Sequence, residues 1–578
     1  MCGIAGFNFE VDKKRVLKTL FHRGPDENSC VKVDNFNFFH TRLAIQDIKN
    51  GSQPFFYNDW MIVFNGEIYN HSQLRKNLKE FDFKTNSDTE TLLYLYLKYK
   101  EKMFDFIDGM FAFAIYDKKN KKLFLARDRA GKKPLYIYKK DKKFAFASEI
   151  NVFKTLNPTI DEEDIKLFLS TGFCESGYKE IREFPAGHFG YYDGELKLKR
   201  YFDIAEYYKA PKIKNPLKEL EELLKISVKN RLFSSDVEVG AFLSGGIDSS
   251  LIVAIASEYT DIKTFTVKFE GAYDESYLAS LVAKKYGLKH EIIDIKMNVK
   301  DNIEKILLNY GKPFFDSSAI PSYFVSKAAR EHVKVVLNGD GADELFGGYR
   351  RYVPFIKGWD KIAKHFTFLL PLLKPKSRGE LMFLYRLLRA ASKEGIHWYN
   401  VLLNDLFEDI YDFHGEKIEK LDKFIKSIDF EGFEKLSYID FEINLKNLLM
   451  KMDIASMSNS LEARSPFLSK YMLEFAPKID KNDKLLKKIL RELAKKYLPL
   501  EIVNAPKRGF EIPLVSWVDG ELRDVIFDYL NYGFYKNFVD EKLVKKIKNK
   551  KLQIPEDKRA KILYLLFALE VWHENSVS

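Results

Sequence analysis

The chain has 578 residues, which is too long for one hydrophobic core, so two or more domains are expected. Its composition, 46% hydrophobic and 31% charged, excludes a disordered or fibrous protein. The formal net charge of +11 would suit nucleic-acid binding, and residues 542–551 are rich in lysine. These lysines alternate with Leu543, Val544 and Ile547 at helical spacing, which predicts that they lie on the solvent-exposed face of an amphipathic helix. We therefore expect no nucleic-acid partner.

The cysteines and the N-terminus indicate the compartment. Cys2, Cys30 and Cys174 are the three cysteines, so no disulfide framework is expected and a reducing compartment is implied. The first residues, Met-Cys-Gly-Ile-Ala-Gly-Phe, reach charged residues within about ten positions, unlike a signal or transit peptide. The apolar runs are shorter than a bilayer crossing requires. A cytoplasmic protein without a membrane partner is predicted.

Residues 1–205 are predicted to form an α+β domain rich in antiparallel strands. Short alternating apolar segments, separated by Asn, Asp and Gly turns, indicate strands, and one stretch near 89–99 is helical. The predicted strands are 36–42, 60–64, 110–116, 123–127, 134–138 and 144–147.

A polar segment with two prolines, 206–219, is predicted as a linker to a second domain, 220–578. Strands and helices alternate after it, which predicts a parallel doubly wound sheet of the α/β class. The predicted strands are 237–243, 264–269, 291–295 and 333–337, and the helices are 251–259, 277–286 and 320–331. From about residue 350 onward the pattern is nearly all helical.

Cys2 has a property that no interior cysteine has. Removal of Met1, which a small second residue permits, leaves a thiol and a free α-amine on one residue. An α-amine has a reference pKa near about 8, so it can take the thiol proton directly or through one water, without a histidine. Position alone would favour a buried structural cysteine over a nucleophile.

Polar clusters recur between the predicted N-terminal strands. They are His22-Arg-Gly-Pro-Asp26, Arg42-Leu-Ala-Ile45, Asn65-Gly-Glu-Ile-Tyr-Asn70 and Ser87-Asp88. Singly, each is compatible with a turn. Together with Cys2-Gly-Ile-Ala-Gly they resemble the glutaminase domain of class II, N-terminal-nucleophile amidotransferases. The resemblance covers about residues 1–200 and includes Asp108-Gly-Met-Phe-Ala-Phe-Ala114, Ala126-Arg-Asp128 and Phe184-Pro-Ala-Gly187.

This resemblance implies roles for individual residues, with Cys2 as the nucleophile. Arg42 would pair with the α-carboxylate of glutamine, and Glu67 and Asp88 would hold its ammonium group. The Asn65 amide and the Gly66 backbone N–H would form the oxyanion hole, where glycine would let the backbone approach the substrate. The implied glutamine-binding set is Arg42, Leu43, Ala44, Ile45, Gln46, Asn65, Gly66, Glu67 and Asp88.

A glycine-rich loop follows the first predicted strand of the second domain: Val239-Gly-Ala-Phe-Leu-Ser244-Gly-Gly-Ile-Asp248-Ser-Ser250. The backbone N–H groups of such a loop and the helix that follows make an anion site. The loop lacks the Walker pattern GxxxxGK[ST]. Its Ser-Gly-Gly-x-Asp-Ser-Ser sequence resembles the pyrophosphate loop of ATP pyrophosphatases, which release AMP and pyrophosphate.

A second cluster, Asn338-Gly-Asp340-Gly-Ala-Asp343-Glu-Leu-Phe-Gly-Gly-Tyr349, follows the strand predicted at 333–337. Ligands bind at this end of strands in open α/β sheets, and the glycines and acids suit a loop around a nucleotide and Mg²⁺. A solvated acidic loop is the alternative. With the segment 451–467, Lys487-Lys-Ile-Leu-Arg491 and Lys507-Arg-Gly-Phe-Glu-Ile-Pro513, the cluster resembles the synthetase domain of asparagine synthetases over most of 220–575.

That family implies ATP as a substrate and Mg²⁺ as a cofactor, with Asp248 and Asp343 as metal ligands. Lys451 and Lys487 would neutralise the departing pyrophosphate. Asp340, implied to be catalytic, falls where some members carry glutamate, a residue tied to adenylate formation and ammonia attack. The implied ATP-binding set is Phe242, Ser244, Gly245, Gly246, Asp248, Ser249, Ser250, Val267, Asn338, Gly339, Lys451 and Lys487, with Phe242, Val267, Asn338 and Gly339 lining the adenine and ribose.

The implied reaction converts ATP, aspartate, glutamine and water into asparagine, glutamate, AMP and pyrophosphate through a β-aspartyl adenylate. Ammonia would pass through the interior, where it stays unprotonated. The family resemblance is compatible with a homodimer. An acceptor such as a sugar acid or a peptide stays open, because the helical region shapes that pocket. A β-lactam-forming synthetase would need no intact glutaminase residues, and a basic nucleic-acid-binding protein would show salt-dependent DNA retention.

Overall fold

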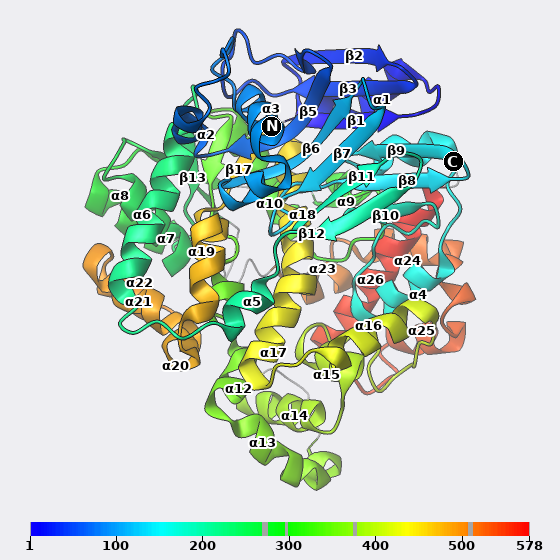
Figure 1. The fold of residues 1–578 in the computed structure, drawn as a ribbon. Helices are drawn as coiled ribbons and strands as arrows, with labels where there is room; N and C mark the ends of the chain where they lie inside the picture. Colours follow the sequence, from blue (N-terminus) through cyan, green and yellow to red (C-terminus); the bar gives the residue numbers. More distant parts are fainter. Residues whose placement is uncertain (1, 269–275, 295–298, 374–378, 507–511, 577–578) are drawn as a thin grey trace.

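The computed structural model describes residues 2–268, 276–294, 299–373, 379–506 and 512–576 (Figure 1). The sheets of the N-terminal region lie at one end of the molecule and a large group of helices lies at the other. Within the described residues, no helix is both long and apolar enough to cross a membrane.

The N-terminal region contains two six-stranded antiparallel sheets. Their strand orders are β10-β8-β9-β1-β3-β2 and β12-β11-β7-β6-β5-β4. The predicted strands and the helix near 89–99 are confirmed, but strand β5 continues beyond 64, so Asn65, Gly66 and Glu67 lie within it. The strands are β1 (Cys2–Phe7), β2 (Glu27–Val33), β3 (Phe36–Arg42), β4 (Phe55–Tyr57), β5 (Trp60–Ile68), β6 (Gly109–Asp117), β7 (Lys122–Arg127), β8 (Tyr136–Lys140), β9 (Lys143–Ala147), β10 (Ile181–Glu183), β11 (His188–Tyr192) and β12 (Leu196–Arg200).

The two sheets pack face to face and helices cover their outer faces. Ile4 and Phe38 of the first sheet share a buried cluster with Val63 and Ala114 of the second. Side chains alternate along a strand, so residues 63, 65 and 67 of β5 all face the space between the sheets. The covering helices are α3 (Asp88–Tyr99) on the second sheet and α1 (Lys13–Leu20) and α4 (Glu162–Thr171) on the first; α2 (His71–Leu74) lies before α3.

A five-stranded parallel sheet forms the centre of the second region, in the order β15-β14-β13-β16-β17. Its strands are β13 (Val239–Phe242), β14 (Lys263–Lys268), β15 (His290–Asp294), β16 (Val335–Leu337) and β17 (Glu462–Arg464). The four predicted strands are confirmed over their described residues. Strand β17 was not predicted, because three residues inside a helical stretch carry no strand periodicity; it pairs with β16.

Helices surround this sheet and form most of the chain after residue 350, as the sequence predicts. The helices near the sheet are α6 (Leu217–Phe233), α7 (Ile247–Ala256), α8 (Ser276–Tyr286), α9 (Val299–Leu308), α10 (Ala319–Arg330) and α11 (Ala342–Phe346). The later helices are α12 (Val353–Lys357), α13 (Trp359–Ala363), α14 (Glu380–Ala391), α15 (Gly395–Leu402), α16 (Glu416–Ser427), α17 (Gly432–Ile439), α18 (Leu445–Met457), α19 (Lys470–Phe475), α20 (Lys481–Lys484), α21 (Lys488–Tyr497), α22 (Leu500–Asn504), α23 (Leu514–Asp519), α24 (Arg523–Tyr532), α25 (Glu541–Lys548) and α26 (Glu556–Glu574).

Helix α5 (Ile204–Lys209) and the start of α6 leave residues 210–216 as the stretch between the two regions. The division into 1–205, a linker at 206–219 and 220–578 stays a prediction.

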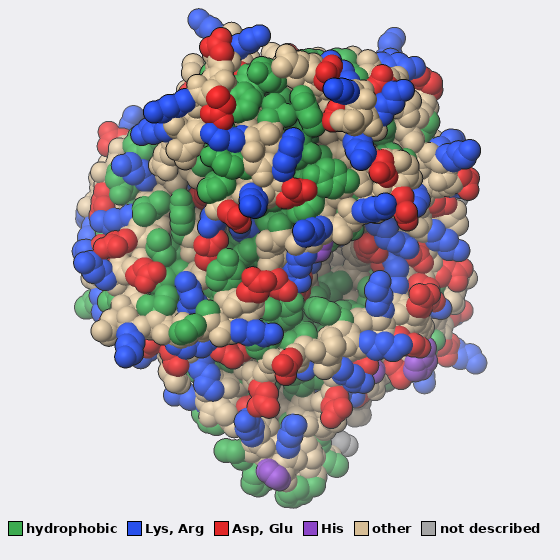
Figure 2. Space-filling view, in the orientation of Figure 1, with side chains coloured by type: hydrophobic (Ala, Val, Ile, Leu, Met, Phe, Trp, Pro, Cys, Tyr) green, Lys and Arg blue, Asp and Glu red, His purple; other side chains and the backbone are tan. Residues whose placement is uncertain are grey.

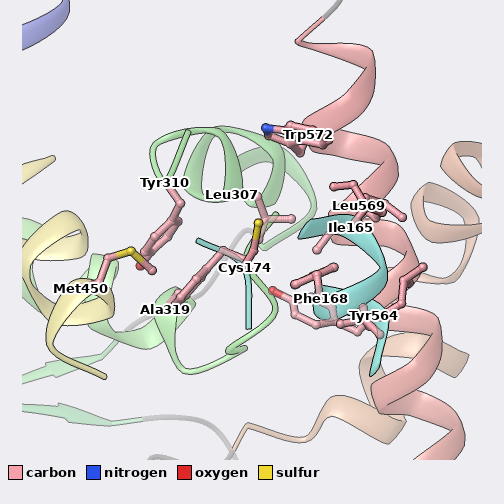
Figure 3. Packing of buried hydrophobic residues seen from close by; sticks show 14 of the residues in the cluster. Ile165, Phe168, Cys174, Leu307, Tyr310, Ala319, Met450, Tyr564, Leu569 and Trp572 are labelled. Atoms are coloured by element: carbon pink, nitrogen blue, oxygen red, sulfur yellow. The ribbon is translucent and has the colours of Figure 1, made fainter. Parts of the chain in front are cut away.

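One hydrophobic core joins the N-terminal and C-terminal regions. Figure 3 shows Ile165 and Phe168 of α4 against Tyr564 and Leu569 of α26, in the same cluster as Trp572. Helix α4, which covers the outer face of the first sheet, is thus itself packed against α26. Burial of this apolar surface holds the two regions together.

The lysine-rich segment forms the amphipathic helix α25, as predicted, with Val544 and Ile547 buried. On the face drawn in Figure 2, cations and anions are intermixed rather than gathered by sign.

A buried ionic cluster connects the first strand to helix α18. The Arg23 guanidinium donates to the Cys2 carbonyl (3.2 Å), to Glu149 (2.9 Å) and to Asp453 of α18 (2.9 Å). Lys133 donates to the other Asp453 oxygen at 2.7 Å. Burial alone would raise the pKa of Asp453, but Arg23 and Lys133 outweigh it and lower that pKa to about 2.

We predict that Asp453→Ala lowers the free energy of unfolding by about 3–5 kcal/mol, because it removes the carboxylate that pairs with buried Lys133 and one of the two carboxylates that pair with buried Arg23. Urea denaturation followed by circular dichroism measures this loss. The control is Glu419→Ala, whose partner Lys423 is 4.0 Å away at the surface, and it should change stability by less than about 1 kcal/mol. Equal stability of the two variants would contradict the structural role of the cluster.

Candidate active sites

Cys2 is the first residue of β1, between strands β3 and β9, and is only 8% exposed. It pairs with Arg42 in the strand register, and its backbone nitrogen donates to Asn65 Oδ1 of the second sheet at 3.3 Å. The cysteine therefore lies where the two sheets meet. Burial raises the pKa of the Cys2 thiol. The thiol needs a base to become a nucleophile near neutral pH.

The proposed oxyanion residues lie beside this cysteine. The Asn65 side chain is fully buried, and its Nδ2 donates to Ser148 Oγ at 3.4 Å. A Cβ at Gly66 would lie 2.1 Å from the Met110 carbonyl oxygen of β6. Glycine at this position is thus required by the close approach of β6, which differs from the expected approach of substrate.

Glu67 and Asp88 are two buried carboxylates with too little positive charge around them to balance both. Burial, and then the charge of Asp88, raise the pKa of Glu67 well above its usual value. Burial also raises the pKa of Asp88 to about 6. Glu67 Oε1 has no hydrogen-bond partner, although Arg464 lies 3.2 Å from Oε2. An added cation would satisfy this pair, as the ammonium group of glutamine would.

Arg42 is buried and holds the turn that follows β3. Its guanidinium donates to Glu27 (3.2 Å), to the Asp47 carbonyl (2.7 Å), and to the carbonyls of Gln46 and Ile48 at 3.2 Å each. A bound carboxylate would have to take over some of these bonds.

The remaining residues of the glutamine set lie in the same turn, where Leu43, Ala44 and Ile45 are buried. Gln46 Oε1 accepts from the Asp88 backbone N–H at 3.3 Å, and its Nε2 donates to the Ser234 carbonyl after α6 at 2.8 Å. The structure thus brings together all of the residues predicted to bind glutamine.

The Ser-Gly-Gly loop connects β13 to α7. Gly245 has φ +73°, a conformation that favours glycine. Ser249 Oγ accepts from the Ser244 backbone N–H at 3.2 Å and lies 3.0 Å from its hydroxyl, while Ser250 is buried. Gly246 caps the start of α7 in extended conformation. The loop thus leads directly into the N-terminus of α7, as in anion sites of this kind.

Lys487 lies between the two predicted metal ligands. Its ammonium group is 2.5 Å from Asp248 Oδ2 and 2.7 Å from Asp343 Oδ1. Burial alone would lower the pKa of Lys487, but the two carboxylates outweigh it and raise that pKa. The carboxylates therefore converge on one position of positive charge.

The loop after β16 packs against the Ser-Gly-Gly loop. A Cβ at Gly339 would lie 3.0 Å from the Asp248 Cβ, so glycine permits this approach. Asn338 Nδ2 donates to Asp340 Oδ2 at 2.7 Å. The two predicted parts of the nucleotide site are adjacent.

Other predicted nucleotide residues lie around these loops. Phe242 ends β13, and Val267 lies in the neighbouring strand β14. Lys451 donates to Ser318 Oγ, just before α10, at 3.1 Å. Residues 507–511 of the Lys507–Pro513 motif lie outside the described residues.

Two cations between the sites received no role from the sequence. Arg464 of β17 reaches Glu67, and Lys132, after β7, lies 3.3 Å from Asp340. Arg464 belongs to the segment 451–467 quoted for the family resemblance, whereas Lys132 lies outside the quoted motifs. Their partners are more than 200 residues away in sequence, so neither spacing nor periodicity signals the contacts.

The two sheets with a cysteine at the start of an inner strand define an N-terminal-nucleophile glutaminase fold. The parallel sheet with its Ser-Gly-Gly loop defines an ATP-pyrophosphatase fold. Two family models match these parts: a glutamine amidotransferase domain over residues 1–202 and asparagine synthase over residues 219–574.

Relatives match along the length of the chain. Asparagine synthetase (glutamine-hydrolyzing) 1 of Bacillus subtilis is 32% identical, over 100% of this chain and 97% of its own. Putative asparagine synthetase (glutamine-hydrolyzing) 2 of Methanocaldococcus jannaschii is 33% identical, over 79% of this chain and 98% of its own. The chain belongs to the asparagine synthase family.

We predict that glutamine binding weakens as the pH falls through about 6, because protonation of Asp88 removes the charge that attracts the ammonium group. The sign follows from the raised pKa: the carboxylate is charged above about 6 and neutral below it. In a Cys2→Ala variant, which cannot turn glutamine over, calorimetric titration should show Kd rising by up to about tenfold per pH unit.

The matched control adds Asp88→Asn to this variant. The amide cannot ionise, so this step should vanish and binding should be weak throughout. The same Kd for Cys2→Ala at pH 5 and pH 7.5 would contradict the role of Asp88.

Proposed function

We propose that the protein is a glutamine-hydrolysing asparagine synthetase, which transfers glutamine-derived ammonia to an ATP-activated aspartate. The carrying observation is that β17 and the residue after it touch both candidate sites. Arg464 contacts Glu67 at 3.2 Å, and Ser465 Oγ donates to Asn338 Oδ1 at 2.6 Å. The names of the relatives favour aspartate over a sugar acid or peptide acceptor.

In the glutaminase half, the α-amine exposed by loss of Met1 takes the Cys2 proton, and the sulfur attacks the carboxamide carbon of glutamine. Asn65 Nδ2 and the Gly66 N–H stabilise the oxyanion. The C–N bond breaks and ammonia leaves with the transferred proton. Water then cleaves the thioester to glutamate. Glu67 and Asp88 hold the ammonium group of the substrate, and Arg42 its carboxylate.

In the synthetase half, a carboxylate oxygen of aspartate attacks the α-phosphorus of ATP and displaces pyrophosphate. Residues 244–250 cradle the phosphates, and Lys487 and Lys451 offset the charge of the leaving group. Ammonia then attacks the acyl carbon and displaces AMP. Phe242, Val267, Asn338 and Gly339 would line the adenine and ribose.

The chemistry of Asp248 and Asp343 fits Mg²⁺, because two carboxylates converge on one position that a cation already fills. When bound there, Mg²⁺ would neutralise phosphate charge. Lys487 would then turn from the carboxylates toward the phosphates. A homodimer, a cytoplasmic location and the stated domain boundaries are further parts of this proposal.

We predict that an ¹⁸O label in the β-carboxylate of aspartate appears in AMP, because ammonia attack breaks the acyl carbon–oxygen bond and the label stays on phosphorus. Mass spectrometry of AMP after turnover with glutamine, ATP and Mg²⁺ measures this. Label in inorganic phosphate would indicate an acyl phosphate and ADP instead. Parallel reactions with sugar acids or peptides as acceptors should release no more pyrophosphate than a blank.

We predict that Cys2→Ala abolishes glutamine-dependent asparagine formation but preserves synthesis from added ammonium at alkaline pH. The substitution removes only the sulfur, while the nucleotide site is unchanged. Chromatographic measurement of asparagine checks both activities, and Cys30→Ala is the matched control. Persistent glutamine-dependent synthesis would make Cys2 structural. Loss of ammonia-dependent synthesis in a folded variant would refute separate sites.

A further inference from the structure

We infer that Lys132, a residue of the glutaminase region, is a positioning residue for Asp340 in the synthetase site. This inference rests on the proposed function and adds to it a residue that serves one half-reaction from the domain of the other.

The backbone around Lys132 is fixed by a compact turn after β7. Asp128 Oδ1 accepts the Lys132 N–H at 2.9 Å, and Asp128 Oδ2 accepts the Lys133 N–H at 2.9 Å. Arg127 donates to the Gly131 carbonyl at 3.0 Å, and Gly131 has φ +72°. The turn therefore aims the Lys132 side chain in a defined direction.

The Lys132 side chain is only 4% exposed, and its ammonium group has two acceptors from the synthetase region. They are Ser465 Oγ at 2.8 Å and Asp340 Oδ2 at 3.3 Å. A buried lysine costs stability unless its charge is paired and hydrogen-bonded. A lysine at this buried location therefore serves its two acceptors rather than the solubility of the surface.

These contacts close a ring of four side chains. Lys132 donates to Asp340 and Ser465, Ser465 donates to Asn338 Oδ1 at 2.6 Å, and Asn338 donates back to Asp340 Oδ2 at 2.7 Å. The ring joins three segments: the turn after β7 with Lys132, the loop after β16 with Asn338 and Asp340, and Ser465 directly after β17. Asp340 Oδ2 accepts two of these bonds, and the Asp340 side chain keeps 26% exposure toward the site.

The ring bears on the step in which ammonia attacks. Attack forms the C–N bond, breaks the bond from the acyl carbon to AMP, and releases AMP with the electron pair. The extra proton of the attacking nitrogen passes to the Asp340 carboxylate and then to solvent. Aspartate reaches one methylene less far than glutamate, so its carboxylate must be held in place. Lys132 supplies the balancing charge and Asn338 fixes the same oxygen.

The experiment compares Lys132→Met, which keeps an unbranched side chain one atom shorter and without charge, with Lys132→Arg, which keeps the charge. Ammonia-dependent asparagine formation is measured in the full-length chain with saturating aspartate. We expect Lys132→Met to lower kcat at least tenfold while KM for ATP changes less than twofold, and Lys132→Arg to recover at least a third of the lost activity.

The matched control is Lys139→Met, which removes an exposed lysine of the same region. Its kcat should equal that of the wild type. Equal kcat values for Lys132→Met and Lys139→Met, with an active wild type, would overturn the inference and leave the proposed function standing. A wild type that forms no asparagine from ammonium would overturn the proposed function itself.

If Lys132→Met does not fold, Ser465→Ala provides a second test. It removes one hydrogen-bond acceptor of Lys132 but leaves the Lys132–Asp340 ion pair in place. A loss of threefold or more in kcat with KM for ATP unchanged supports the ring. Wild-type kcat in Ser465→Ala would count against it, as would equal losses in Lys132→Met and Lys132→Arg.

Discussion

The pairing of Arg23 with Asp453 holds the molecule in its working arrangement. Arg23 donates to the carbonyl of Cys2, the proposed nucleophile, and Asp453 belongs to α18 of the synthetase region. Both side chains are fully buried, and Asp453 keeps the two cations that pair with it, Arg23 and Lys133, only while the two regions stay docked. The position of Cys2 thus depends on a helix some 450 residues away along the chain.

At the contact between the regions, each region places a basic side chain beside a carboxylate of the other. Arg464 of the synthetase region pairs with Glu67 in the proposed glutamine site, and Lys132 of the glutaminase region pairs with Asp340 in the proposed synthetase site. Each site therefore contains a charge that the opposite region supplies. Neither site is complete by itself, so separation of the two regions would weaken both half-reactions together. For an enzyme that moves ammonia between two sites, this links the activity of one site to that of the other.

Local sequence predicted the strands around Cys2 and the parallel strands of the second region well, since alternating and continuous apolar runs carry their own signal. The Ser-Gly-Gly loop could also be predicted, because its glycines and the start of the next helix are signals in the local sequence. The family resemblance, rather than periodicity, supplied the roles of Arg42, Glu67 and Asp340. Strand β17 could not be predicted, because its three residues become a strand only by pairing with β16. The Lys132–Asp340 contact could not be predicted either, because it depends on tertiary packing and not on the spacing of residues in the sequence.

The packing of α4 against α26 has a consequence for synthesis on the ribosome. The partners of Ile165 and Phe168 lie near residue 569, so about 400 further residues must be made before this apolar face is covered. At about 5–20 residues per second, the wait is roughly 20 to 80 s. During that time the first sheets can form, but one of their covering helices keeps its buried side open. Until α26 is made, the glutaminase region therefore exposes an apolar surface at which aggregation can begin.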